Sequence, residues 1–156
     1  MARHTFTVTS SMTPDAAFAA LVALENVPEW DSGILSSTKV DRPGNEAGPL
    51  GDRYDLVVTG FDGQPDSAVY EITEVDRPHG FVMVGTNDTF RAVDELVIRD
   101  VPNGCEVTYR AELTLLGEHP PLNERQLASM FPKIAAVAER GLTAYLNPRQ
   151  SVSDTS

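Results

Sequence analysis

The chain has 156 residues, of which 41% are hydrophobic and 22% charged, as expected of one globular domain with a sizeable core. Its net charge of -11 disfavours nucleic acid and anionic membranes as partners, because phosphate groups would be repelled. With a single cysteine and three scattered histidines, the sequence offers neither an internal disulfide nor a His/Cys metal site.

The first half of the chain is predicted to contain one strand, two helical segments and a weak strand. Residues 3–9 alternate between apolar and polar, which is typical of a strand. Residues 14–24 form an apolar helix, and residues 26–31 form a short helical turn that ends near an aromatic residue. The serine-rich residues 34–41 indicate a further strand, and the glycine- and proline-rich residues 43–51 indicate a loop.

The helix at 14–24 could be mistaken for the core of a signal peptide. Before it, however, Thr13, Pro14 and Asp15 read as an N-cap, a first-turn proline and a first-turn acid. The residues after it, beginning with Glu25, do not form a small-residue cleavage pattern. We therefore predict a folded helix in a cytoplasmic protein. The excess of arginine over lysine weakly indicates a bacterial genome of high GC content.

The middle of the chain is predicted to be an antiparallel sheet in which each strand has a buried face. Alternating runs predict strands at 53–59, 68–75, 81–84, 90–98 and 105–116. The last two runs are separated by Asn103-Gly104, a pair that suits a type I′ hairpin turn because both central residues need positive φ.

The end of the chain is predicted to be one long amphipathic helix over residues 122–146, since its apolar residues recur every three or four positions. Pro132 lies inside it and is expected to kink it. We predict a single domain over residues 1–147 and a disordered polar tail over residues 148–156.

These elements together resemble a known superfamily. The N-V-P-E-W turn at 26–30, the E-I-T-E-V-D-R-P run at 71–78, the Asn103-Gly104 hairpin and the last helix occur in the expected order. The chain resembles the SRPBCC or START-like helix-grip superfamily, and within it the polyketide cyclase/dehydrase branch. The resemblance implies an α+β fold with two short helices after the first strand. It also implies a curved, seven-stranded antiparallel sheet around the C-terminal helix, with a cavity between them.

The resemblance also implies a class of ligand. Members bind lipids, sterols, polyketides or plant hormones, and some are aromatase/cyclases that hold a poly-β-ketone with cavity tyrosine, arginine and tryptophan residues. The implied partner here is a small hydrophobic molecule, without cofactor, metal, nucleic acid or membrane insertion. The protein would be a monomer or a homodimer.

Asp94 is the most specific candidate for chemistry. It shares a predicted strand face with Phe90 and Leu96, so a cavity on that face would surround a carboxylate with apolar groups. Burial would raise its pKa and suit it to proton abstraction next to a carbonyl. Tyr70 and Tyr109 lie on inward faces and complete the predicted catalytic set. The alternative is a bulge that turns Asp94 to solvent.

The predicted ligand contacts are large residues on inward faces and near the proline of the last helix. They are Trp30, Tyr54, Phe81, Met83, Phe90, Leu96, Phe131 and Ile134. For Trp30 and for the tyrosines the alternative is a place in the core. Gly141 indicates either a close backbone approach or space for a ligand.

Three functions are compatible with these residues. The first is a binding or carrier protein for a hydrophobic molecule. The second is a cofactor-independent polyketide cyclase/dehydratase that uses Asp94 with Tyr70 or Tyr109. The third is a co-chaperone-like interaction module, which would have a filled cavity and an exposed apolar patch.

Overall fold

The computed structural model describes residues 1–40 and 48–148. The predicted loop at 43–51 lies partly outside the described residues, and the predicted tail at 148–156 lies almost wholly outside them. The remaining elements follow the predicted order of one strand, two short helices, six strands and a long helix.

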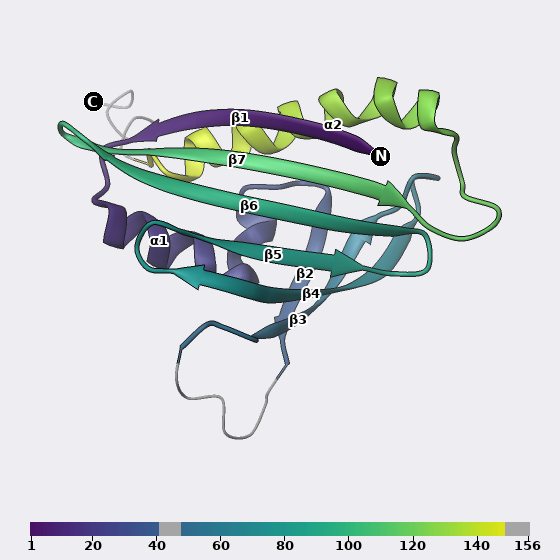
Figure 1. Ribbon diagram of the computed structural model, residues 1–156, viewed down its shortest axis with the longest axis horizontal. Coiled ribbons are helices and arrows are strands. Elements are labelled where there is room, and N and C mark those ends of the chain that lie inside the picture. Colours follow the sequence, from purple (N-terminus) through teal and green to yellow (C-terminus); the bar gives the residue numbers. More distant parts are fainter. Residues whose placement is uncertain (41–47, 149–156) are drawn as a thin grey trace.

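Seven antiparallel strands form one curved sheet (Figure 1). They are β1 (Ala2–Ser10), β2 (Ile34–Lys39), β3 (Arg53–Thr59), β4 (Pro65–Asp76), β5 (Gly80–Thr86), β6 (Phe90–Val101) and β7 (Gly104–Leu115). Their order is β1-β7-β6-β5-β4-β3-β2, so the first strand of the chain pairs with the last. This pairing leaves β1 and β2 as the edges of the sheet.

Three helices accompany the sheet: α1 (Pro14–Val22), the 3-10 helix η1 (Leu24–Glu29) and α2 (Glu124–Tyr145). The Thr13 side chain caps α1 by accepting a hydrogen bond from the Ala16 amide at 3.2 Å. A reciprocal capping box between Asn123 and Gln126 begins α2. These capping hydrogen bonds explain why α1 begins after Thr13 and α2 after Asn123.

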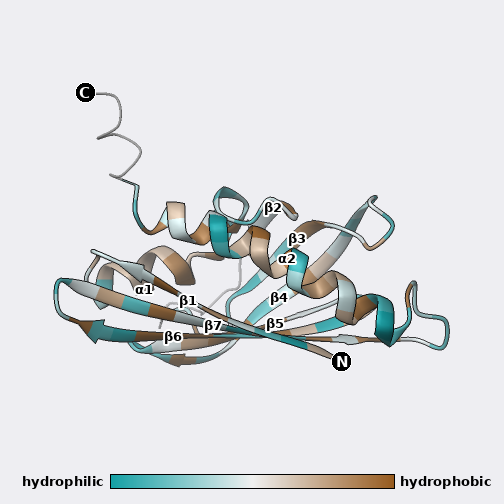
Figure 2. Ribbon diagram, turned by 90° about the horizontal axis from the view of Figure 1, so that it is seen from above, coloured by the Kyte–Doolittle hydropathy of each residue, from teal (hydrophilic) through white to brown (hydrophobic). Residues whose placement is uncertain are grey.

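The long helix α2 lies across one face of the sheet (Figure 2). It continues through Pro132, whose missing N–H leaves the Ala128 carbonyl without its usual helical donor. Near its other end, a Cβ at Gly141 would overlap the carbonyl oxygen of Trp30. Gly141 therefore permits a close backbone approach, one of the two roles that the sequence left open.

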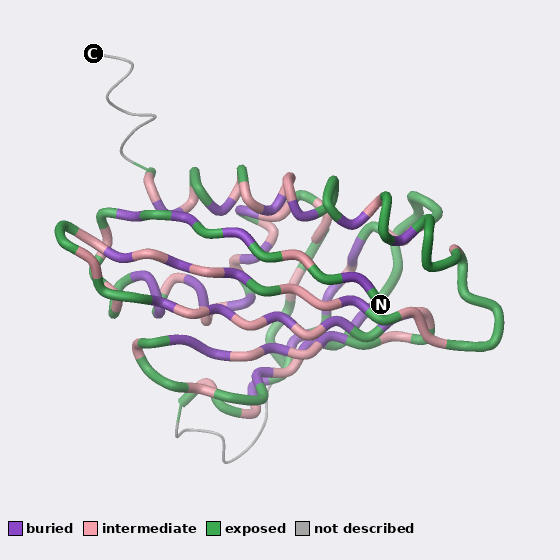
Figure 3. The backbone as a smooth tube through the Cα atoms, turned by 45° about the horizontal axis from the view of Figure 1, so that its top comes forward, coloured by how far each residue is buried: buried purple, intermediate pink, exposed green. Residues whose placement is uncertain are grey.

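The strands present one buried and one wetter face, as predicted (Figure 3). On the inner face of β6, Phe90, Asp94 and Leu96 are buried. On the outer face, Arg110 pairs with Glu95 across the strands at 3.1 Å. A second outer ion pair joins β3 to β4. Such cross-strand pairs stabilise a sheet modestly and keep its outer face hydrated.

The hairpin between β6 and β7 is confirmed, but its predicted turn type is wrong. Val101 pairs with Gly104, so the two central residues of the turn are Pro102 and Asn103. Proline holds φ near -65°, which excludes a type I′ turn. Of the two central residues only Asn103 has a positive φ, of 70°, while Gly104, with a φ of 157°, is the first residue of the next strand. Negative φ followed by positive φ is the pattern of a type II turn.

Candidate functional site

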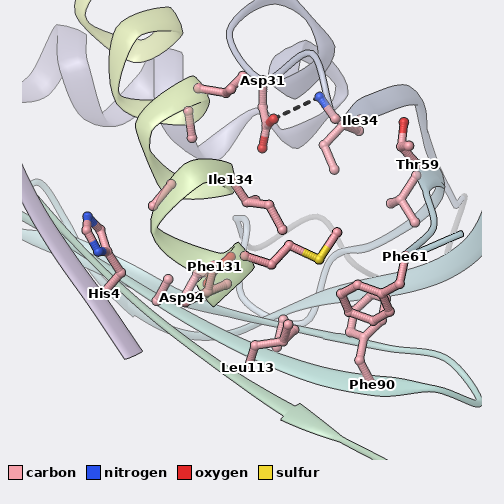
Figure 4. A pocket seen from close by; sticks show the side chains of 18 of the residues that line it. His4, Asp31, Ile34, Thr59, Phe61, Phe90, Asp94, Leu113, Phe131 and Ile134 are labelled. Carbon is pink, nitrogen blue, oxygen red and sulfur yellow. Dashed lines mark hydrogen bonds between the residues drawn. The ribbon is translucent and has the colours of Figure 1, made fainter. Parts of the chain in front are cut away.

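A cavity of about 450 Å³ lies between α2 and the inner face of the sheet. Apolar side chains make up most of its wall, and several of them are shown in Figure 4. From α2 come Phe131, Ile134 and their neighbours one turn away. From the sheet come Phe90, Leu113 and others on the inner faces of β6 and β7. Pockets of about 300–1,000 Å³ are usual for small-molecule ligands.

Asp94 lines this cavity from the middle of β6. The strand pairs with β5 and β7 without a register shift, so the bulge that would have turned Asp94 outward is not present. Only 8% of its surface is exposed. The structure therefore places a carboxylate inside a largely apolar wall, as the sequence predicted.

Tyr109 holds the Asp94 carboxylate in place. Its hydroxyl donates a hydrogen bond to Oδ2 of Asp94 at 2.8 Å. Burial raises the pKa of Asp94 to about 7, although the hydrogen bond from Tyr109 lowers it and the charge of Asp31 raises it further. At neutral pH this carboxyl group is thus poised between its protonated and charged forms.

Asp31 is a second carboxylate on the cavity wall, and sequence reasoning missed it. It follows η1, and one of its oxygens, Oδ1, accepts a hydrogen bond from the Gly33 amide at 3.0 Å (Figure 4). Burial raises its pKa, while this hydrogen bond lowers it. Its position directly after Trp30 in the N-V-P-E-W turn was the one available signal.

Tyr70 reaches the cavity from β4 because its neighbour on β5 is a glycine. Tyr70 pairs with Gly85, and a Cβ at that position would overlap the tyrosine ring. The ring can therefore lie across β5. Burial and the charges of Asp94 and Asp31 raise the pKa of Tyr70, so its hydroxyl stays protonated.

The Tyr70 hydroxyl differs from that of Tyr109 in having no hydrogen-bond partner within residues 1–40 and 48–148. Only 9% of the Tyr70 surface is exposed. Buried tyrosine hydroxyls usually find a partner. Because Tyr70 lines the cavity, this hydroxyl is available to water or to a molecule in the cavity.

The predicted ligand contacts fall into three groups. Phe90, Phe131 and Ile134 line the cavity, and Ile134 is 40% exposed. Trp30 and Met83 border a much smaller pocket of about 30 Å³ that shares Asp31, Tyr70, Asp94 and Tyr109 with the main cavity.

Tyr54, Phe81 and Leu96 line neither pocket, so the structure does not bring them to the site. The Tyr54 hydroxyl donates instead to Glu25 at 3.4 Å. Phe81 packs edge-on against Phe18 of α1, with ring centroids 5.9 Å apart. These residues face inward, but α1 and η1 cover that part of the sheet and turn it into ordinary core.

Several wall residues were not predicted because they come from elements far apart in sequence. Phe6 of β1 stacks on Tyr109, with ring centroids 5.2 Å apart and an interplanar angle of 8°. Phe61, in the turn before β4, packs edge-on against Phe90 at 6.2 Å. Met130 joins them from α2. The sequence offered no signal that this turn bends over the sheet.

No arginine lines the cavity among the residues that the structure describes. In the same part of the chain, no group of three or more His, Cys, Asp or Glu residues could hold a metal ion. None of the described helices has the length and apolar character needed to cross a membrane.

The model of the family described as polyketide cyclase / dehydrase and lipid transport matches residues 1–146. Solved structures with the same fold include a START superfamily protein from Mycobacterium smegmatis. It is 12% identical, with a TM-score of 0.74 over 92% of this chain and 96% of that one. Among curated proteins, none has a matching sequence.

Two further structures are similar. The Zhui aromatase/cyclase from a Streptomyces species is 9% identical, with a TM-score of 0.72 over 93% of this chain and 90% of that one. A protein from Thermus thermophilus is 15% identical, with a TM-score of 0.72 over 99% of this chain and all of that one, at 100%. At these identities the likeness concerns the fold.

Proposed function

Because the chain belongs to the polyketide cyclase/dehydrase and lipid transport family, we propose that it binds a small hydrophobic molecule, polyketide- or lipid-like, between the sheet and α2. The observation that carries the proposal is the cavity of about 450 Å³ with its mostly apolar wall. Protein interiors are normally packed with few voids larger than a water molecule. A preformed, mostly apolar pocket of this size is the usual form of a small-molecule site.

Native mass spectrometry of the purified protein tests this function, followed by denaturing extraction of whatever is retained. Binding of a fluorescent apolar dye in competition with candidate ligands covers the case of an exchangeable ligand. The control is Phe131→Trp, which adds volume at a wall position. We expect the wild type to retain or bind an apolar molecule and the variant to bind it weakly. Equal binding by both proteins would place the ligand elsewhere, and no binding by the wild type would contradict the function.

Catalysis without a cofactor is the second candidate, and the pKa of about 7 for Asp94 favours it. In this reaction Oδ1 of Asp94 takes a proton from the carbon next to a ligand carbonyl, and the electron pair of that C–H bond forms an enolate. The Tyr70 hydroxyl donates a hydrogen bond to the enolate oxygen. Tyr109 positions the carboxylate of Asp94. It therefore does not take the place of Tyr70 as the hydrogen-bond donor to the enolate.

Proton exchange separates this candidate from simple binding. The α-protons of a bound β-diketone should exchange with heavy water faster in the presence of the wild type than without protein. Asp94→Asn should abolish the acceleration while binding persists. An unchanged exchange rate in the variant would remove Asp94 from the reaction. The third hypothesis, an interaction module, required a filled cavity, and the cavity volume speaks against it.

A further inference from the structure

The charge of the cavity wall is one-sided. Among the described wall residues there are four carboxylates, Asp31, Asp66, Asp94 and Glu112, but no lysine or arginine, and His4 is the one basic side chain. An anionic ligand would bring its charge beside these carboxylates with no cation to pair with, and an unpaired charge in a low-dielectric site is costly. The wall therefore disfavours carboxylates and phosphates.

Two of the four carboxylates already have partners of their own. Glu112 pairs with Arg3 at 3.0 Å. Asp66 accepts a hydrogen bond from the Asn87 side chain at 3.2 Å. Asp66 keeps its charge, because asparagine is neutral, but it is exposed and its charge is screened by water. The negative charge that a buried ligand would meet is therefore mainly that of Asp31 and Asp94.

Asp31 and Asp94 each have one oxygen without a hydrogen bond from the described residues. Oδ1 of Asp31 is engaged by the Gly33 amide, and Oδ2 of Asp94 by Tyr109. This leaves Oδ2 of Asp31 and Oδ1 of Asp94. Each carboxylate raises the pKa of the Tyr70 hydroxyl, which has no partner among the described residues, so the three groups lie within electrostatic reach of one another.

These three groups come from three separate elements and meet at one place. Asp31 follows η1, Tyr70 is on β4 and Asp94 is on β6. All three border both the main cavity and the small pocket, so they lie where the two join. Two carboxylate oxygens and one hydroxyl oxygen can accept three hydrogen bonds, and an ammonium group has three N–H donors.

We propose that the cavity selects ligands that carry an ammonium group on an apolar body, with the ammonium held by Asp31, Asp94 and Tyr70, and that it rejects carboxylate- and phosphate-bearing ligands. This inference rests on the proposed binding function, which it makes specific. The apolar body of the ligand occupies the space between α2 and the sheet. Charge-assisted hydrogen bonds to two carboxylates orient the ligand in it.

The test uses three probes with the same bicyclic body and different heads: naphthylmethylamine, naphthylmethanol and naphthoate. Their affinities for the wild type are measured by isothermal titration calorimetry at about pH 8, where Asp94 is charged and the amine is still protonated. We expect the amine to bind at least about tenfold more tightly than the alcohol, and naphthoate not to bind detectably.

The outcomes separate the two proposals without any variant. If the alcohol binds and the amine binds no more tightly, the ammonium preference is overturned while the cavity function stands. The same conclusion follows if naphthoate binds as well as the amine. If none of the three binds, the proposed binding function fails, and the inference fails with it.

Substitutions then show which residues cause the preference for the amine over the alcohol. Asp31→Asn and Asp94→Asn keep the shape of the side chains and should each reduce the amine-to-alcohol ratio severalfold, with the affinity for the alcohol nearly unchanged. The matched control is Glu95→Gln, which removes a carboxylate next to Asp94 that lines neither pocket and is paired with Arg110 on the outer face. Its ratio should stay that of the wild type. An unchanged ratio in both test variants, with folding confirmed by circular dichroism, would overturn the assignment of these residues.

Discussion

The hydroxyl of Tyr109 lies 2.8 Å from Oδ2 of Asp94, and this hydrogen bond joins two neighbouring strands inside the cavity. Asp94 is directly opposite Ala111, and Tyr109 is directly opposite Leu96, so the two residues are diagonal neighbours on one face. The tyrosine thereby fixes one oxygen of the carboxylate and leaves the other, Oδ1, without a hydrogen bond from the described residues. A hydrogen bond to the charged form of a carboxyl group stabilises that form.

Tyr109→Phe should therefore raise the pKa of Asp94 above its value of about 7. The expected increase is on the order of one pH unit, because a hydrogen bond to a charged group contributes about 1.5–3 kcal/mol. An NMR titration of the aspartate carboxyl carbons measures it. Tyr54→Phe is the control, since its hydroxyl bonds Glu25 and lines neither pocket. A pKa that stays the same or falls in Tyr109→Phe would contradict the prediction.

Asp94 should also make the stability of the protein depend on pH. Its pKa of about 7 in the folded state is above its usual value, so the folded state holds the proton more tightly than the unfolded state does. The free energy of unfolding then falls as pH rises between about 4 and 7, by up to about 1.4 kcal/mol per pH unit. Above about pH 7 Asp94 is deprotonated in the folded state too, so the proton no longer contributes to the free energy of unfolding.

Asp94→Asn removes this dependence, because an asparagine at this position does not titrate. Relative to the wild type, the variant should gain about 2 kcal/mol of unfolding free energy between about pH 5 and pH 8. Urea unfolding at the two pH values measures the change. Glu95→Gln, which removes an outward-facing carboxylate next to it, should show no comparable gain. A difference between wild type and Asp94→Asn that is the same at both pH values would exclude a raised pKa.

The fold and the inward direction of both residues could be predicted from the sequence, but their contact could not. A turn centred on Asn103-Gly104 would pair Pro102 with Cys105, and in that register Asp94 would lie opposite Leu113. Asp94 and Tyr109 would still share a face, since such a shift preserves the alternation. They would no longer be diagonal neighbours. The observed pairing of Val101 with Gly104 brings them together.

The limits of the cavity were beyond sequence reasoning for a different reason. Alternation tells which face of a strand is buried, but it does not tell what covers that face. Phe81 and Phe90 both face inward, yet α1 covers Phe81, whereas Phe90 faces the open volume under α2. Asp31 was missed because it lies in an irregular segment, where no periodicity reports direction.

Gly85 should be needed for the position of Tyr70. A methyl group at this position would overlap the tyrosine ring, so Gly85→Ala should destabilise the protein by about 1–3 kcal/mol and weaken ligand binding. In a Tyr70→Ala background the overlap is absent, and Gly85→Ala should cost little there. Urea unfolding of the four proteins in this cycle measures the coupling. The same cost in both backgrounds would show that the ring does not depend on this glycine.

Filling the cavity should raise the stability of the protein and lower its affinity for ligands. Ala135 lines the cavity from α2 and is buried, whereas Ala128 on the same helix is exposed and does not line it. Ala135→Leu places about three more carbons in empty space, where each buried carbon contributes about 0.8 kcal/mol. We therefore expect a higher melting temperature and a large loss of affinity for apolar ligands.

Ala128→Leu is the control, because it makes the same change on the outer side of α2. It should alter neither property appreciably, because helix propensity is nearly the same for the two residues. Lower stability of Ala135→Leu together with unchanged binding would mean that the wall at this position is closed and that the ligand lies elsewhere.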